Sequence, residues 1–277
     1  MTEKKRIRVA ILDLYEGVDN QGMRCIRELL NDFGESQGLD LDWDEFEVRL
    51  LQQVPDLSYD IFISSGGPGS PLDSENSDWE KKYFNWINEL ETYNAAPSTN
   101  NPKKALFICH SYQLACRYFK VAEVVKRKST AFGVFPIHML EEAKEETVFA
   151  GLQDPFYAVD SRDYQVIQPN YKRLRQLGAT LLCIEKNRPH VPYERAIMGV
   201  RFNPHMIGTQ FHPEADPVGM TMYLQREDKM KTVIENHGEE KWRSMIDHLN
   251  DPDKIRWTYS HIIPNFLSDA VGSPVMS

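Results

Sequence analysis

The stretch ALFICHSYQLAC, residues 105–116, decides how the rest of the chain is expected to fold. It opens with four apolar residues that predict a buried strand, and beyond Cys109 the spacing of Tyr112, Ala115 and Phe119 is helical. Cys109 is therefore expected at a strand-to-helix turn, where the free N–H groups and the positive dipole end of the helix favour a thiolate. A cysteine in this place is either a nucleophile or a small hydrophobic residue at the end of a core strand.

Strands and helices alternate before this stretch. Residues 21–33 have helical spacing with Gly34 as a stop signal, the acidic residues 39–45 predict a connector, and a second helix is marked by apolar residues from Trp79 to Leu90. The predicted strands are residues 7–14, 46–51 and 59–64. This order predicts an α/β fold, a mostly parallel, doubly wound, flavodoxin-like sheet with helices on both faces and its site beyond the carboxyl ends of the strands.

The second half of the chain predicts shorter elements. Residues 126–137 return to strand, residues 140–146 form a charged turn or short helix, and residues 180–211 contain the three strands of an antiparallel meander. The short strands are residues 156–159, 180–185, 195–201 and 206–211, and the final helices are residues 220–235, 239–249 and 259–271. We expect an α/β domain over residues 1–216 and a C-terminal helical extension over residues 217–277 that packs on the same domain.

Composition narrows the functional classes. With 277 residues and 41% hydrophobic content the chain can bury one large core, and its net charge of −9 lacks the basic excess that nucleic-acid binding requires. No apolar run is long enough to cross a bilayer and no secretion signal is evident, so a cytoplasmic protein without membrane contact is expected. The four cysteines lack CxxC spacing, which predicts reduced thiols with neither a disulfide framework nor a metal site, and no cofactor is expected.

Two further segments contain residues that could take part in catalysis. The sequence SSGGPGSP at residues 64–71 follows a predicted strand, and its exposed amides could cradle a developing negative charge or simply form a tight turn. It lacks the Gly-Lys-Ser/Thr ending of a phosphate-binding loop. His212 and Glu214 are two apart on an extended segment stiffened by Pro213, so they can share one face as a base and the carboxylate that orients it.

Three segments together resemble a known family. They are GGPGSP at residues 66–71, Ile108-Cys109 with Gln113 four residues on, and GTQFHPE at residues 208–214. These are similar, in the same order, to the signatures of the class I, triad-type glutamine amidotransferases. The similarity extends from about residue 6 to residue 216 and looks closest to stand-alone glutaminase domains described as GMP-synthase-like.

The resemblance implies a catalytic triad. Cys109 would attack the side-chain carboxamide of glutamine, His212 would move the protons and Glu214 would orient His212. A thioester on Cys109 would then be hydrolysed to glutamate.

The remaining implied roles concern the oxyanion and the substrate. Backbone N–H groups of Gly67 and His110 would form the oxyanion hole. The residues implied in binding glutamine are Gln113, Gly66 and Ser161.

This chain also departs from the family pattern. The family usually has glycine two residues before and two residues after the nucleophile, whereas this chain has Phe107 and Ser111. The family often has a histidine-containing turn where this chain has Ser161-Arg162-Asp163.

Three functions follow from these motifs. The first is a glutaminase or amidotransferase that releases ammonia to an acceptor, with the acceptor-activating synthetase acting in trans and self-association into a homo-oligomer left open. The second keeps the triad for other acyl chemistry, such as homoserine O-acyl transfer or γ-glutamyl peptide hydrolysis. The third is a catalytically silent binding module that keeps the fold.

Overall fold

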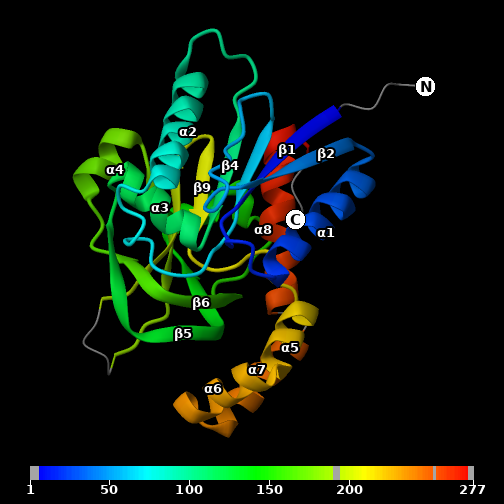
Figure 1. The fold of residues 1–277 in the computed structure, drawn as a ribbon, viewed down its shortest axis with the longest axis vertical. Coiled ribbons are helices and arrows are strands. Elements are labelled where there is room, and N and C mark those ends of the chain that lie inside the picture. Colours follow the sequence, from blue (N-terminus) through cyan, green and yellow to red (C-terminus); the bar gives the residue numbers. More distant parts are fainter. Residues whose placement is uncertain (1–5, 190–193, 252–253, 274–277) are drawn as a thin grey trace.

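The computed structural model describes residues 6–189, 194–251 and 254–273. In this part of the chain nine strands form one sheet in the order β2-β1-β3-β4-β9-β8-β7-β5-β6 (Figure 1). The strands are β1 (Arg6–Asp13), β2 (Asp40–Glu47), β3 (Ile61–Ser64), β4 (Lys104–Ile108), β5 (Glu123–Met139), β6 (Phe156–Ile167), β7 (Thr180–Glu185), β8 (Ile197–Asn203) and β9 (Met206–Thr209). The five strands from β2 to β9 are parallel, and the four beyond β9 continue the sheet antiparallel.

Helices cover both faces of the parallel half. The helices are α1 (Gln21–Gln37), α2 (Asp78–Ala95), α3 (His110–Phe119), α4 (Tyr171–Leu177), α5 (Pro217–Gln225), α6 (Glu227–His237), α7 (Glu239–Asn250) and α8 (Ile255–Val271), with short 3₁₀ turns at Glu141–Glu145 and Thr147–Phe149. Figure 1 shows α2, α3 and α4 on one side of the sheet and α1 and α8 on the other. The predicted α/β fold with helices on both faces is confirmed.

Alternation along the strands explains these two layers. On β1, Val9 and Ile11 lie in the core shared with α1 and α8, whereas Ala10 and Leu12 lie in the core shared with α2 and α3. The strands are apolar on both faces because both are covered, which is the pattern of a buried parallel sheet. This arrangement places the carboxyl ends of β1, β3 and β4 at one edge, where their loops gather.

The second strand lies earlier in the sequence than predicted. Residues 46–51 were expected to form it and residues 39–45 to connect, but β2 is Asp40–Glu47. The prediction is wrong because β2 is the edge strand, where most side chains are partly or fully exposed and acidic residues are tolerated on both faces. Hydrophobic periodicity gives little signal for such a strand.

Several helix and strand ends also differ from the prediction. Helix α1 continues past Gly34, which packs against Leu41, and ends at Gly38 in the left-handed conformation. The strand expected over residues 156–159 continues to Ile167, and α4 was not predicted. The helix expected over residues 220–235 is divided into α5 and α6.

The last helix belongs to the main core. Ile262, Ile263, Phe266 and Leu267 of α8 lie in the same cluster as α1 and β1 residues. Helices α5 to α7 contribute to a smaller cluster with Val134 of β5 and Val159 of β6. The division of the chain at residues 216 and 217 stays a prediction. Across the described ranges, no helix combines the length and apolar character needed to cross a membrane.

Candidate active site

Cys109 lies between β4 and α3 in a backbone conformation that few non-glycine residues adopt. Its φ is 49° and its ψ is −98°. The backbone N–H of Cys109 donates to Thr209 O at 2.8 Å, and its carbonyl accepts from Gln113 N at 3.0 Å. These two bonds hold a turn that strains the chain and lifts the side chain off the end of the strand, as in a nucleophile elbow.

Ser111 stabilises this turn in place of the family's glycine. Its hydroxyl accepts from Ile108 N at 2.7 Å and lies 2.7 Å from Ser64 O, to which it donates. The side chain is fully buried. Ser111 thereby joins the ends of β3 and β4, the two strands whose loops carry the glycine segment and the cysteine.

Phe107, the other departure, points away from the turn into the core under α2 and α3. Its ring is fully buried and meets Phe202 at a centroid distance of 6.1 Å, edge to face. Gly208 lies opposite on β9, and a Cβ there would stand 3.3 Å from Phe107 Cβ and 2.7 Å from Tyr112 Cδ2. Phe107 therefore lies opposite a glycine on the neighbouring strand, and the absence of a side chain at Gly208 leaves space for the Phe107 Cβ and for the rings of Tyr112 and Phe202.

Restoring the family's glycine should cost stability. We expect Phe107→Gly to lower the free energy of unfolding by about 4 kcal/mol, because it removes a buried ring and adds backbone freedom. Denaturant unfolding measures the loss, and Phe107→Leu is the matched control with a smaller loss. A drop below about 1 kcal/mol would contradict this role of the ring.

His212 and Glu214 form the pair that the sequence predicts. Nδ1 of His212 lies 2.8 Å from Glu214 Oε1, and the Glu214 side chain is 1% exposed. His212 N donates to Val159 O at 2.9 Å, which fixes the segment against β6. Burial alone would lower the pKa of His212, but the charges of Glu214 and Cys109 and hydrogen bonds with both raise this pKa well above its usual value.

The cysteine and the histidine converge beside Gly66. A Cβ on Gly66 would stand 2.8 Å from His212 Cε1, 3.0 Å from the Tyr15 hydroxyl and 3.6 Å from Cys109 Cβ. The Cys109 sulfur also lies 3.8 Å from Ser161 O and 3.8 Å from Gln210 Nε2. The residue is only 5% exposed, so the thiol is enclosed by histidine, amide and carbonyl groups.

Gly67 and His110, predicted to supply backbone donors, follow Gly66 and Cys109 directly in the chain. A Cβ on Gly67 would stand 2.5 Å from Leu14 O, so only glycine fits there. His110 is the first residue of α3, where helix N–H groups lack partners in the helix. Its imidazole is buried, and burial together with the charges of Arg49 and Arg117 lowers its pKa to about 3.

Gln113 and Ser161 take places that the motifs did not predict. Nε2 of Gln113 is bonded to Gln210 Oε1 at 3.0 Å and to Tyr164 O at 3.3 Å, so this amide holds Gln210 against the thiol. Ser161 belongs to β6 rather than to a turn, and it is its carbonyl that faces the sulfur.

Gln210 and Tyr15 are the neighbours of the thiol that sequence reasoning missed. Gln210 lies two residues before His212 in the segment GTQFHPE at residues 208–214, and on an extended segment this spacing places both side chains on the same face. That spacing was the signal by which Gln210 could have been found. Burial and the Glu214 carboxylate raise the pKa of Tyr15 well above its usual value, so its hydroxyl stays neutral. No sequence pattern around Tyr15 points to this position.

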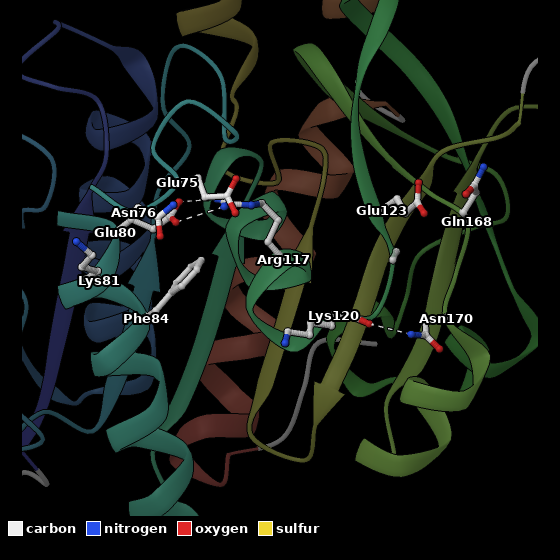
Figure 2. A pocket seen from close by; sticks show the side chains of 11 residues that line it. Glu75, Asn76, Glu80, Lys81, Phe84, Arg117, Lys120, Glu123, Gln168 and Asn170 are labelled. Carbon is white, nitrogen blue, oxygen red and sulfur yellow. Dashed lines mark hydrogen bonds and ion pairs between the residues drawn. The ribbon is translucent and has the colours of Figure 1, made fainter. Parts of the chain in front are cut away.

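A large cavity lies away from this cluster. It measures about 740 Å³ and is lined from α2, α3 and neighbouring loops, with Glu80, Lys81 and Arg117 among its side chains (Figure 2). Arg117 and Glu80 are paired at its wall, and Lys120 O accepts from Asn170 Nδ2 at 3.4 Å. The described residues contain no group of three or more His, Cys, Asp or Glu side chains placed to hold a metal ion.

Comparison with solved structures supports the fold. A glutamine amidotransferase from Thermotoga maritima is 15% identical, with a TM-score of 0.67 over 96% of this chain and 99% of that chain. The glutaminase domain of Trypanosoma brucei CTPS with bound acivicin is 12% identical, with a TM-score of 0.59 over 98% and 96%. A putative GMP synthase subunit from Thermoplasma acidophilum is 20% identical, with a TM-score of 0.51 over 84% and 98%.

The sequence itself defines the family. Residues 12–228 match the model described as glutamine amidotransferase class-I. The chain belongs to the class I glutamine amidotransferase family, as its three motifs predict. A search of curated proteins finds no match to the chain.

Proposed function

We propose that this protein hydrolyses the side-chain amide of glutamine through a thioester on Cys109 and releases ammonia. The observation that carries the proposal is the convergence of Cys109 and the His212–Glu214 pair beside Gly66, in a chain of this family. The proposal also fits the strained turn at Cys109, because a purely structural cysteine has no need of it.

The proposed reaction has two halves. In the first, the Cys109 sulfur bonds to the amide carbon, His212 takes the thiol proton, and the oxyanion is held by the N–H groups of Gly67 and His110. When the C–N bond breaks, His212 returns the proton to the departing ammonia. In the second half, His212 takes a proton from water and the resulting hydroxide attacks the thioester. The carbon–sulfur bond then breaks to give glutamate and a thiolate, which takes the proton back from His212.

Glu214 supports both halves. By accepting from Nδ1 it leaves the other ring nitrogen of His212 for the sulfur, and its charge stabilises the imidazolium. We further propose that glutamine binds beside Gly66, with the Ser161 carbonyl as an acceptor for its amino or amide N–H and with Gln113 acting through Gln210.

The ammonia acceptor would be activated by another protein. We propose a synthetase partner that acts in trans, in the cytoplasm, where the four cysteines would stay reduced. The structure describes all four as free thiols in buried positions, which is compatible with that compartment.

Purified protein tests the proposal directly. With glutamine as the substrate, glutamate and ammonia should appear in equal amounts. Consumption of an acyl-CoA or of a γ-glutamyl peptide in place of glutamine would transfer the triad to other acyl chemistry. Absence of turnover on all of these, together with no reaction of Cys109 with a glutamine-like chloroketone, would favour a silent binding module.

A further inference from the structure

The glycine segment at residues 66–71 is held by side chains rather than by its own backbone. At its start Ser65 Oγ donates to Gly66 O at 2.8 Å, and near its end Ser70 Oγ accepts from Leu72 N at 3.1 Å. Within the described part of the chain, no backbone-to-backbone hydrogen bond ties any of these six residues. Three of them are glycines, which restrict the chain least. A loop of this kind would sample many conformations unless side chains hold it, yet Gly67 N–H is the proposed oxyanion donor.

An arginine holds this loop near its middle. Arg49, which follows β2, donates from Nη1 to Pro68 O at 2.7 Å and to Leu14 O at 3.3 Å. The Leu14 carbonyl is the one that packs on Gly67. Glu16 lies 3.0 Å from Nη2 of Arg49 and fixes the guanidinium from its other side.

A second arginine holds the end of the same loop. Arg117 of α3 donates from Nη1 to Pro71 O at 2.6 Å and pairs with Glu80 of α2 at 2.5 Å. Ser74 Oγ donates to Glu80 Oε2 at 2.6 Å and lies 3.3 Å from Pro71 O. Figure 2 shows the Arg117–Glu80 pair at the wall of the cavity.

The charges of both arginines also act on the start of α3, although Arg117 itself lies in the last turn of that helix. They contribute to the lowered pKa of His110, the residue after the cysteine. The direct contacts of the two guanidinium groups are with Leu14 and with the loop that carries Gly67. A bond from a charged donor to a carbonyl is stronger than a neutral one, so two such bonds can fix a segment that its own backbone leaves free.

We propose that Arg49 and Arg117 are positioning residues that fix the loop of residues 66–71 and thereby hold Gly67 N–H in place for the reaction at Cys109. The proposal rests on the proposed function in that the held group is the oxyanion donor. Among the described contacts, neither arginine bonds to Cys109. Their effect is on the transition state, because the oxyanion forms only there.

The expected effect is on kcat. Loss of one donor from an oxyanion hole costs about 10² to 10³ in kcat, so a donor that is loosened rather than removed should cost about 10- to 100-fold. We expect Arg117→Met to lower kcat by this factor with KM changed less than about threefold. Arg117→Lys, which keeps one donor, should recover part of the loss.

A chemical probe separates the loop from the thiol. Iodoacetamide alkylates a thiolate by displacing iodide and forms no oxyanion, so its rate reports Cys109 without the oxyanion hole. Labelling should be specific for Cys109, because the other three cysteines stay protonated. Burial is the main cause that raises the pKa of Cys25 to about 12 and also raises the pKa of Cys116 and of Cys183. The alkylation rate of Arg117→Met should stay within about twofold of the wild type.

Arg201→Met is the matched control. Arg201 pairs with Glu146, and both side chains are as buried as those of Arg117 and Glu80, with exposures of 13% and 9% against 15% and 6%. It makes no bond to residues 66–71 among the described contacts. Arg201→Met should lose as much thermal stability as Arg117→Met and keep its kcat. In the double variant of Arg49→Met and Arg117→Met, the loss of kcat should be less than the product of the two single losses, because both arginines act on one loop.

Hydrogen exchange distinguishes failure of this inference from failure of the proposed function. The amides of Gly66, Gly67, Gly69 and Ser70 should exchange faster in Arg117→Met than in Arg201→Met, whether or not glutamine is the substrate. Equal losses of kcat in the two variants, or exchange at the loop that does not change, would overturn the positioning role. A wild type without glutaminase activity would overturn the proposed function, and the exchange data would still decide the role of the arginines.

Discussion

Replacing Cys109 by alanine should reduce glutamine hydrolysis by about 10⁴-fold or more, because the variant has no atom that can form the thioester. The fold should survive, since the side chain is small and its backbone bonds to Thr209 and Gln113 do not involve the sulfur. Release of ammonia and glutamate measures the activity, and thermal unfolding measures the fold.

Cys116→Ala is the matched control for this variant. Cys116 lies on α3, the helix that follows Cys109, and is fully buried, and its replacement by alanine makes the same change in side-chain volume. It should lose about 1 kcal/mol of stability and keep glutamine turnover within about threefold. A Cys109→Ala protein that retains more than about one hundredth of the wild-type rate would exclude a covalent thioester at this residue.

The second large effect concerns the charge of Glu214. Glu214→Gln keeps an oxygen that can accept from His212 Nδ1 but removes the negative charge, so we expect kcat to fall by about 10² to 10⁴. In the wild type, burial lowers the pKa of His212, but the charges of Glu214 and of the Cys109 sulfur raise it by more. The pKa is therefore raised overall, and the imidazolium persists to higher pH. This imidazolium is the form that delivers the proton to the departing ammonia, so its loss at high pH sets the alkaline limb of kcat/KM. Without Glu214 that limb should move to lower pH.

The same shift has a consequence for stability. Because the pKa of folded His212 is raised above its unfolded value, the stabilisation by its protonated form is complete below the unfolded pKa and is lost as pH rises through the folded one. Glu214→Gln should reduce this stabilisation, most clearly at mildly acidic pH. Urea unfolding at several pH values measures it.

Asp216→Asn is the control for both measurements. It makes the same chemical change two residues further on, where Asp216 pairs with Arg24 at 2.7 Å. It should lower stability and leave the alkaline limb in place. If the alkaline limb of kcat/KM lies at the same pH in Glu214→Gln as in the wild type, the titration of His212 does not cause that limb.

The sheet could be predicted where both of its faces are covered. In β1, β3 and β4 nearly every side chain is buried, so the apolar runs mark the strands directly. β2 could not be predicted because it lies at the edge, and its order Asp-Leu-Asp-Trp-Asp reflects partial exposure rather than burial. The inner residues of β6 include Asp160 and Arg162, which bond to each other and so do not read as apolar positions.

The candidate site could be predicted where its chemistry is local. Cys109 and the His212–Glu214 pair each belong to a short segment whose spacing carries the signal, although their roles stay predictions. Arg49 and Arg117 reach the glycine loop through contacts between distant parts of the chain. Their positions depend on packing of the finished fold, and no spacing in the sequence encodes it.

The conformation of Cys109 implies a conflict between two demands on one position. A positive φ with a side chain costs about 1 to 3 kcal/mol, and glycine would relieve most of it. Selection for a robust fold alone would therefore favour glycine at this turn. A protein that keeps a thiol at this turn is less stable than one with glycine there. Where selection for turnover is relaxed, we therefore expect the cysteine to be among the first residues of the site to be replaced.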